Sequence, residues 1–369
     1  SMRAMFLFEA TLSPAPYISP LVRPCSPYGI GEIVIVDSIE GLDETSQFVR
    51  LRKAFPKHDV YLKLEGLNTA GSVKLKTAIS LVDSLEKQGT LKKGGWLVES
   101  SSGSLGVALA AVAARRGYRL SIVSDLNANP KSIAHMRALG AEVEVVEQRD
   151  AAGGFLGTRL ARIRELVSSC DGPLWTNQYS NQANPFVHSS KTYRAIVDAL
   201  GDPDYIFVGA GTTGTLMGVC RGVAASRAAT RVYAVDSVGS VTFGGSPSCR
   251  YIPGLGASVP PPLFDASLVL EQHAVDEIDT VRQCRRVAQL EGFLPGGSTG
   301  TVLACFDALQ DVIPEGSRVV AISPDMGERY LDSIYNDDWV MDKFGPAVLD
   351  ISRRSAVYTM KTNREDAEC

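Results

Sequence analysis

The sequence lacks the residue patterns that mark disulfide frameworks and metal sites. Its seven cysteines are scattered, odd in number and form no Cys-x-x-Cys pair. This distribution argues against a disulfide framework or a zinc site and is typical of the reducing cytoplasm. The four histidines form no His-x-x-x-His spacing. We therefore expect no metal ion and a cytoplasmic location.

Long apolar runs and a strong net charge are also missing. No run of about 18 apolar residues occurs, so the sequence predicts no membrane span. The net charge is −4, which indicates neither a nucleic acid nor an anionic membrane as partner. Residues 1–3 resemble a tag remnant, and residues 4–18, broken by Pro14 and Pro16, have no apolar core of a signal peptide.

Short apolar strands alternate with amphipathic helices along most of the 369 residues, a length that favours two lobes. One set of strands and helices is predicted at 95–99, 105–116, 119–124, 130–139 and 141–146, and a second at 205–208, 215–225, 231–236, 276–291, 301–310 and 318–323. This order predicts an α/β fold of two lobes, each a mostly parallel twisted sheet flanked by helices. Ligands of such sheets bind beyond the carboxyl ends of the strands, so we expect the active site in the cleft between the lobes.

The lobes can be placed on the sequence. We assign residues 1–62 and 175–345 to a larger lobe and residues 63–174 to a smaller, mobile lobe. Residues 346–369 are assigned to a polar tail, which lacks periodicity from about Arg353 and is predicted to be frayed.

Lys74 lies in a loop of small residues, 68–76 (NTAGSVKLK), after a predicted strand at 60–65. Enclosure in such a loop removes water from an amine and lowers its pKa. A neutral amine can then attach to an aldehyde cofactor. The ordinary alternative is a solvated lysine at a helix start, where Ser72 would serve as the N-cap.

Two loops between a strand and a helix are suited to anions. Residues 100–106 (SSSGSLG) offer hydroxyls and a helix N-terminus to a carboxylate or phosphate, although the same residues would also serve as an N-cap. Residues 209–215 (GAGTTGT) expose backbone amides and threonine hydroxyls, which suits a phosphate. This second loop also fits Gly-x-Gly-x-x-Gly, with Asp236 at the end of the next strand, so a nicotinamide dehydrogenase stays open as an alternative.

Two further loops have polar groups at positions that suit a ligand. Ser298 lies in PGGSTG (295–300), before a predicted helix, and is either an N-cap or a hydroxyl directed at a ring nitrogen. The loop 177–185 (NQYSNQANP) supplies uncharged donors and acceptors that suit a substrate carboxylate, Gln178 among them. An ordinary polar turn is the alternative for this loop.

These motifs occur together and in the order SVK, SSGxxG, QYxNxANP, GTTGT, PGLGAS and GGSTG. In that order the chain resembles the fold-type II enzymes that use pyridoxal 5′-phosphate (PLP), such as cysteine synthases and cystathionine β-synthases, over roughly residues 20–345. The resemblance implies PLP as cofactor, β-replacement on an activated serine, amino acids as the small-molecule substrates and a homodimer.

The resemblance also implies roles for individual residues. Lys74 matches the catalytic lysine that attaches the cofactor, and Ser298 matches the serine that faces the pyridine nitrogen. The cofactor phosphate is matched by Gly211, Thr212, Thr213, Gly214 and Thr215. The positions that bind the substrate are matched by Ser101, Ser102, Gly103, Gln178 and Gly254, and Arg250 could bind a phosphate leaving group or a carboxylate of the nucleophile, or be a surface residue.

Within this family the chain resembles the synthases of staphyloferrin B type, which join O-phospho-L-serine and L-glutamate into N-(2-amino-2-carboxyethyl)-L-glutamate, a precursor of 2,3-diaminopropionate. The segments that carry this closer resemblance are 55–58 (FPKH), 150–159 (DAAGGFLGTR), 236–244 (DSVGSVTFG), 250–258 (RYIPGLGAS) and 328–332 (ERYLD). The pathway served would be that of a siderophore or an antibiotic.

Three positions depart from the family pattern. Ser104 stands where most members have an asparagine that contacts the 3′-oxygen of the cofactor, and Thr69 and Leu75 replace a proline and an aspartate. Two alternatives to the glutamate-using synthase therefore stay open. One is a cysteine synthase that uses O-phosphoserine or O-acetylserine, and the other is a PLP-binding protein without activity.

Overall fold

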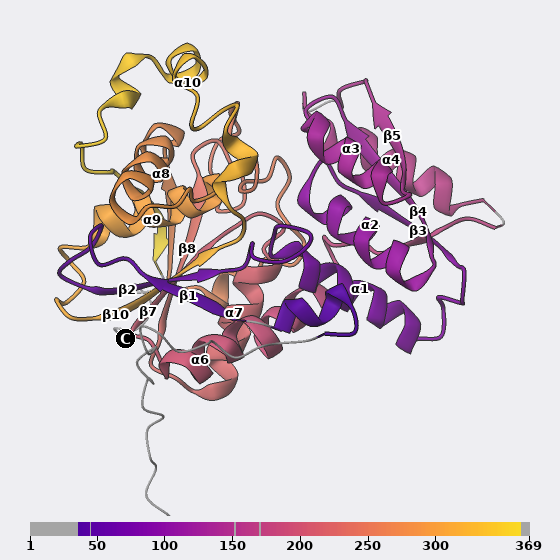
Figure 1. Ribbon diagram of the computed structural model, residues 1–369, viewed down its shortest axis with the longest axis horizontal. Coiled ribbons are helices and arrows are strands. Elements are labelled where there is room, and N and C mark those ends of the chain that lie inside the picture. The colour runs from indigo at the N-terminus through magenta and orange to yellow at the C-terminus, as the bar shows by residue number, and fades with distance from the viewer. Residues whose placement is uncertain (1–35, 45, 151–152, 170, 363–369) are drawn as a thin grey trace, which may run out of the picture. The chain divides into compact units, whose positions relative to one another are not determined.

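The computed structural model describes residues 36–44, 46–150, 153–169 and 171–362, which include both predicted sets of strands and helices. Residues 1–18, with the predicted tag remnant, lie outside the described residues, as do Cys25, Cys170 and Cys369. Two sheets flanked by helices form the architecture (Figure 1). We call the seven-stranded sheet with its helices the large lobe and the four-stranded sheet with its helices the small lobe.

The large lobe is built on a sheet with the strand order β1-β2-β10-β7-β8-β9-β11. Its inner pairs are parallel, while the edge strands β1 and β11 run antiparallel to β2 and β9. The bounds are β1 (Gln47–Arg50), β2 (Asp59–Leu64), β7 (Tyr205–Gly209), β8 (Arg231–Ser237), β9 (Glu271–Val275), β10 (Arg318–Ser323) and β11 (Tyr358–Thr362).

The small lobe is built on a parallel sheet with the order β5-β4-β3-β6. The bounds are β3 (Trp96–Ser100), β4 (Arg119–Asp125), β5 (Glu142–Val146) and β6 (Leu174–Trp175). Strands of such a sheet are buried on both faces, and in β4 every residue after Arg119 is buried, the polar Ser121, Ser124 and Asp125 included.

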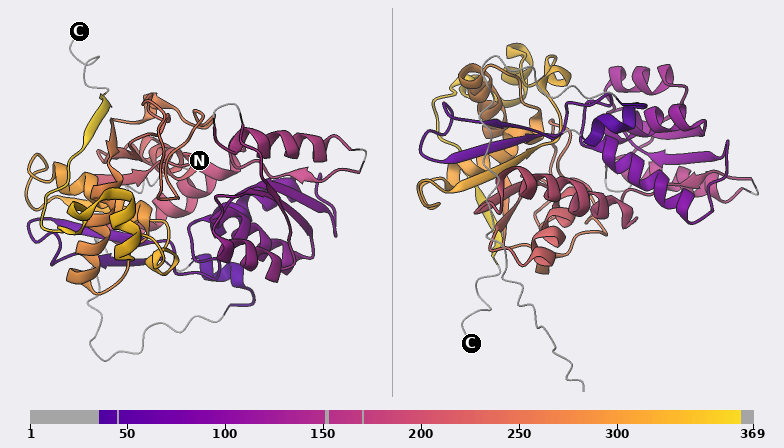
Figure 2. Two further views of the ribbon diagram at one scale, coloured as in Figure 1. Left: turned by 90° about the horizontal axis from the view of Figure 1, so that it is seen from above. Right: turned by 60° about the horizontal axis from the view of Figure 1, so that its bottom comes forward.

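Helices cover both faces of each sheet. In the large lobe α8 and α9 lie on one face and α6 and α7 on the other, as Figures 1 and 2 show. The helices are α1 (Lys74–Lys87), α2 (Ser104–Arg116), α3 (Pro130–Ala138), α4 (Leu156–Val167), α5 (Ala183–Val187), α6 (Arg194–Leu200), α7 (Gly214–Ser226), α8 (Glu277–Glu291), α9 (Gly297–Leu309) and α10 (Asp337–Phe344). Shorter segments are a π-helix at His188–Tyr193 and 3-10 turns at Ile39–Glu44, Ala266–Leu268, Gly327–Tyr330 and Pro346–Leu349.

The loops of interest lie at the carboxyl ends of parallel strands. The loop that contains Lys74 follows β2, residues 211–215 follow β7, and residues 101–104 follow β3. Because parallel strands end at the same edge of a sheet, the loops after β2, β7, β8 and β10 share one edge of the large lobe. The fold thus gathers segments that are far apart in the chain.

Three details differ from the sequence prediction. The tail prediction is wrong at Tyr358–Thr362, where β11 pairs with β9 and Met360 packs on the core. A short strand that completes a sheet edge gives too weak a period to be recognised in a polar segment. Helix α9 begins at Gly297, not at 301, because packing overrides the low helix propensity of its glycines. The predicted lobe boundaries at 62/63 and 174/175 each fall within a strand, β2 and β6.

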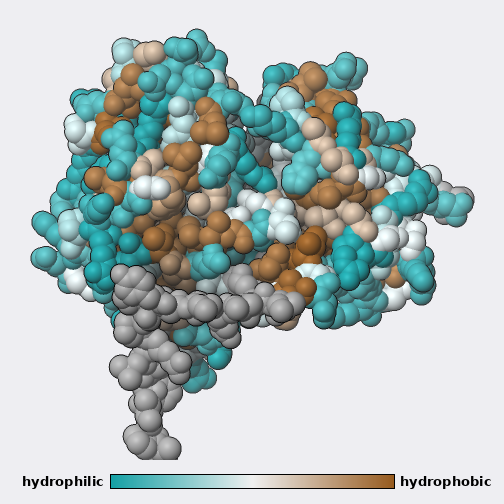
Figure 3. All heavy atoms as spheres, in the orientation of Figure 1, coloured by the Kyte–Doolittle hydropathy of each residue, from teal (hydrophilic) through white to brown (hydrophobic). Residues whose placement is uncertain are grey.

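The surface in view in Figure 3 is mostly hydrophilic around its rim, with hydrophobic residues gathered nearer its middle. Among the helices that the structure describes, none has the length and apolar character needed to cross a membrane. Exposed large apolar residues are scattered, such as Val312 at 77 % exposure.

Phe306 is the centre of the aromatic core of the large lobe. Its ring contacts those of Phe55 and Phe207, with centroids 4.9 and 5.6 Å apart. We expect Phe306→Ala to lower the free energy of unfolding by about 3–5 kcal/mol, because it removes a fully buried ring and leaves a cavity. Chemical denaturation checks this value. Val312→Ala is the control and should change stability by less than about 0.5 kcal/mol; equal effects of the two changes would contradict the assignment of the core.

Candidate active site

Lys74 is the first residue of α1 and follows a loop that is held by the Asn68 side chain and by a backbone hydrogen bond to the segment after β10. The Asn68 side chain donates to the carbonyls of Glu65 and Ser72, at 3.0 and 2.9 Å, and accepts from the Ala70 amide. The Val73 amide donates to the carbonyl of Pro324 after β10, at 2.7 Å. Burial lowers the pKa of the Lys74 amine to about 8, against an opposing effect of Glu99. A substantial fraction of this amine is therefore neutral near physiological pH.

Glu99, near the end of β3, is the carboxylate whose charge acts on Lys74. It is fully buried and accepts hydrogen bonds from Thr176 Oγ1, Trp175 Nε1 and the amides of Ser100 and Gln178, at 2.6 to 3.0 Å. Burial raises the pKa of Glu99 above its usual value, while the four donors act in the opposite direction. The sequence reading placed this residue in a strand and gave it no role.

The loop that follows β3 leads into the N-terminus of α2. Ser101 Oγ accepts from the amides of Gly103 and Gly106, at 3.3 and 2.9 Å, so this hydroxyl stabilises the helix start. Ser102 and Gly103 remain partly exposed. Ser104 Oγ accepts a hydrogen bond from Arg329 of the large lobe, at 3.1 Å, and Arg329 also donates to the Ala70 carbonyl in the Lys74 loop.

Residues 211–215 form the narrow turn after β7 and the first two residues of α7. Thr213, at the N-cap of α7, has φ of 65° and supplies no side-chain cap, so the first amides of the helix lack a side-chain partner. A non-glycine residue in this left-handed region is strained, and such strain concentrates at functional sites. A Cβ atom at Gly211 would lie 2.9 Å from the Gly254 carbonyl, so only glycine fits there.

Ser298 lies in the first turn of α9 and is 4 % exposed. Its hydroxyl has no hydrogen-bond partner in the part of the chain that the structure describes. Gly254 lies against this hydroxyl, because a Cβ atom there would be 2.4 Å from Ser298 Oγ. This hydroxyl is therefore available to a polar ligand.

Contacts link these loops to one another. The side-chain amide of Asn184 donates from Nδ2 to the Gln178 carbonyl at 2.8 Å and to Thr212 Oγ1 at 3.3 Å. These bonds connect the amide-rich loop 177–185 to residues 211–215. The Gln178 side chain donates to the Ser100 carbonyl at 3.1 Å. Asp325 connects the Lys74 loop, through its backbone bridge to Ser72, with the turn before Ser298.

Asp325 was not recognised from the sequence. It is buried, accepts from the Tyr330 hydroxyl at 2.8 Å, and its second oxygen, Oδ1, lies 2.0 Å from the position of a Cβ at Gly296. Burial raises its pKa to about 6. The only signal in the sequence was a carboxylate residue just after a predicted buried strand. The contacts of Asp325 come from segments far apart in the chain, around Ser72, Gly296 and Tyr330.

Arg250 does not join the loops around Lys74. Its guanidinium donates to the Gly239 carbonyl and lies beside Gly256 and Ser258. No carboxylate of the described residues is within ion-pair distance of it, so it is available to an anion at this edge of residues 254–258.

The arrangement fits PLP. A lysine amine of lowered pKa suits attachment to an aldehyde, and the start of α7 offers free amides and hydroxyls to a phosphate. The unpartnered hydroxyl of Ser298 suits an acceptor such as a ring nitrogen. Lysine, anion-binding turn and hydroxyl together define a PLP-dependent enzyme.

The family model of the pyridoxal-phosphate dependent enzymes matches residues 41–325, and the chain belongs to this family. Its cofactor is PLP, and the nicotinamide-dehydrogenase interpretation is wrong. The Gly-x-Gly-x-x-Gly spacing that suggested it suits a phosphate in either class of enzyme.

Solved structures of cysteine-synthase-like enzymes are similar. An O-ureido-L-serine synthase with O-ureido-L-serine bound is 32 % identical, with 84 % of this chain and 95 % of that chain covered and a TM-score of 0.76. A second structure of O-ureido-L-serine synthase is also 32 % identical, with 84 % and 96 % covered and a TM-score of 0.74. A hydrogen sulfide-producing enzyme from Fusobacterium nucleatum is 28 % identical, with 80 % and 100 % covered and a TM-score of 0.75. The chain is a PLP-dependent β-replacement enzyme of the cysteine-synthase-like type.

The lowered pKa of Lys74 predicts its chemical reactivity. In protein freed of cofactor, labelling of Lys74 by an aldehyde and borohydride should be half-maximal near pH 8 and rise with pH, because only the neutral amine reacts. Ordinary lysines require about pH 10.4. Glu99→Gln should move the midpoint to lower pH, because it removes the charge that favours the protonated amine. Peptide mapping measures the labelling, and a midpoint near pH 10 would contradict the burial of this amine.

Proposed function

We propose that the chain is a synthase that uses PLP to replace the phosphate of O-phospho-L-serine by the amine of L-glutamate. The product would be N-(2-amino-2-carboxyethyl)-L-glutamate, on the way to 2,3-diaminopropionate. β-Replacement on an activated serine agrees with the similar structures, whose names include an O-substituted serine and hydrogen sulfide. The choice of a phosphorylated donor rests on a buried arginine of the small lobe.

Arg159, on α4, is the observation that favours a phosphate leaving group. It is 9 % exposed, and its Nε lies 3.2 Å from Asp125 Oδ2 at the end of β4. That Nε makes no hydrogen bond of good geometry, and the buried hydroxyl of neighbouring Ser124 has no partner in the described part of the chain. Asp125 balances the charge of Arg159, but the donors of Arg159 Nε and Ser124 Oγ are left without a hydrogen-bond acceptor among the described residues, which is costly for buried polar groups. Unused donors beside a guanidinium suit a phosphate.

The surroundings of Arg159 support this location. Its charge acts on the half-buried phenol of Tyr179, whose pKa is raised overall by desolvation, with Arg159 opposing this rise. Tyr179 follows Gln178, the residue proposed to bind the substrate carboxylate, and Gln178 contacts Ser100 at the end of β3. The guanidinium is therefore close to the loops proposed to hold the amino-acid substrate. In the sequence, the segment 150–159 carries only the closer family resemblance, and no role was predicted for Arg159.

The proposed roles of the chain's own residues follow from their chemistry. PLP supplies an electron sink for negative charge at Cα of the bound amino acid. Lys74 takes the proton from Cα as general base and later returns it. Ser101, Ser102, Gly103 and Gln178 orient the α-carboxylate, residues 211–215 hold the cofactor phosphate, and Ser298 accompanies the ring nitrogen without protonating it. Movement of the small lobe would exclude water from the reaction.

L-Glutamate as nucleophile rests on the sequence resemblance, and Arg250 is the cation available for one of its carboxylates. The alternative is sulfide, which needs no cation for its recognition. A cysteine synthase would therefore not depend on Arg250.

Absorbance of the purified protein tests the proposed function directly. We expect a visible band of PLP joined to a lysine amine, absent from Lys74→Ala. O-Phosphoserine should change this spectrum with release of phosphate, and L-glutamate, but not sulfide, should then restore it. Restoration by sulfide alone would establish a cysteine synthase instead. A yellow protein whose spectrum does not change with any serine donor would favour a PLP-binding protein without activity.

Arg159→Met tests the donor. We expect KM for O-phosphoserine to rise about tenfold to a hundredfold, because a charge-assisted contact is lost, while KM for O-acetylserine changes little. Arg250→Ala is the matched control and should affect the glutamate KM but not the ratio between donors. An equal loss with both donors after Arg159→Met would show that this arginine is only structural.

A further inference from the structure

His188 is a buried histidine that lies behind the proposed phosphate site and has no role in the proposed mechanism. It begins the π-helical segment His188–Tyr193 and is 0 % exposed. Its Nε2 is 3.3 Å from Thr215 Oγ1 on α7 and 3.1 Å from Thr77 Oγ1 on α1, and its Nδ1 is 3.0 Å from Thr192 Oγ1. π-Helical turns are rare and frequently occur at functional sites.

The packing brings this ring as close to α7 as the backbone allows. A Cβ atom at Gly218 would lie 2.4 Å from the Cβ of His188, so only glycine permits the approach. Thr215, in the first turn of α7, keeps part of its surface exposed. The same threonine can therefore contact His188 with one side of its hydroxyl and a ligand with the other.

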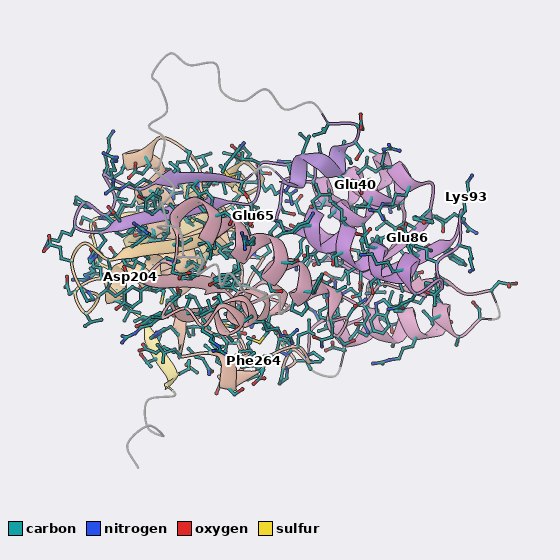
Figure 4. All side chains as sticks on the ribbon, turned by 90° about the horizontal axis from the view of Figure 1, so that it is seen from below. Glu40, Glu65, Glu86, Lys93, Asp204 and Phe264 are labelled. Atoms are coloured by element: carbon teal, nitrogen blue, oxygen red, sulfur yellow. The ribbon has the colours of Figure 1, made fainter. Side chains whose placement is uncertain are left out.

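The imidazole is neutral in this environment. Burial lowers the pKa of His188 well below its usual value, and the charges of Lys76, Lys74 and Lys63 act in the same direction, with Glu65 opposing them. Glu65 is paired to Lys63 and Lys76 at 2.9 and 2.8 Å, and all three side chains are buried. Figure 4 shows Glu65 within the body of the molecule, unlike Lys93, which points outward at its edge.

A neutral imidazole donates through one nitrogen only, and the ligand decides which one. A phosphate dianion only accepts hydrogen bonds, so the Thr215 hydroxyl must give its proton to the phosphate. Its oxygen is then free to accept from His188 Nε2–H, while His188 Nδ1 accepts from Thr192. In this arrangement the Nε2–H lies between the oxygens of Thr77 and Thr215, and the Thr215 hydroxyl is held with its hydrogen toward the ligand.

We infer that His188 is a positioning residue, which orients the Thr215 hydroxyl as a donor to the phosphate of PLP. The inference rests on the proposed role of residues 211–215, and it adds a residue from another helix to that site. His188 itself does not touch the cofactor in this arrangement. Its contribution is limited to the phosphate and leaves the aldehyde end of the cofactor unaffected.

The test compares PLP with pyridoxal, which has the same ring and aldehyde but no phosphate. Apoenzyme is titrated with each compound. The ratio of the Kd for pyridoxal to the Kd for PLP measures the phosphate contribution. We expect His188→Leu to weaken PLP binding about tenfold, the effect of one lost hydrogen bond in a buried site, with pyridoxal binding unchanged. His188→Gln should restore the ratio, because its amide nitrogen can reach the position of Nε2.

Three further variants make the outcomes distinct. Thr215→Val should reduce the ratio, and the double variant His188→Leu with Thr215→Val should be no worse than Thr215→Val alone, since both remove the same contact. Thr77→Val, which removes the other partner of Nε2, should leave the ratio unchanged. A ratio unaffected by Thr215→Val would reject residues 211–215 as the phosphate site. A ratio reduced by Thr215→Val but not by His188→Leu would overturn the role of His188 alone, as would equal weakening of PLP and pyridoxal.

Discussion

The chemistry of this site depends on one lysine amine that gives up its proton close to physiological pH. A protonated amine neither attaches an aldehyde nor removes a proton from Cα, so burial of Lys74 is required. Each unit of lowered pKa corresponds to about 1.4 kcal/mol, and the fold must supply this energy. The Lys74 loop is fixed by Asn68 and by a backbone bridge to Asp325, which prevents the amine from escaping to solvent.

Glu99 limits how far burial can lower the pKa of Lys74. A buried carboxylate near Lys74 favours the protonated amine, yet its four donors, among them Trp175 and Thr176, already stabilise its charge. The carboxylate therefore competes only partly for the lysine proton, and the pKa of Lys74 stays near 8. The small lobe, through β3, thus contributes to the reactivity of a lysine at the start of α1.

The sequence allowed prediction of the repeated strands and helices and of the main loops, because period, glycine turns and clusters of hydroxyls are local signals. Lys74, Ser298 and residues 211–215 were predicted as candidates in this way. Glu99, Asp325 and His188 were not, because their surroundings come from strands and helices distant in the chain. Strand β11 was missed for a related reason: its pairing with β9, and not its own composition, makes it a strand.

The proposed phosphate site at residues 211–215 and the amine of Lys74 have opposite electrostatic requirements. A dianion favours nearby positive charge, but a cation in contact with Lys74 would lower its pKa further and also compete for the aldehyde. At the proposed phosphate site both requirements are met by neutral groups, namely the amides of α7 and threonine hydroxyls. Burial alone would raise the pKa of Glu65, but Lys76 and Lys63 outweigh it and hold that pKa at about 2. The neutral ring of His188, in contact with Thr77 on α1 and Thr215 on α7, adds no charge to this region.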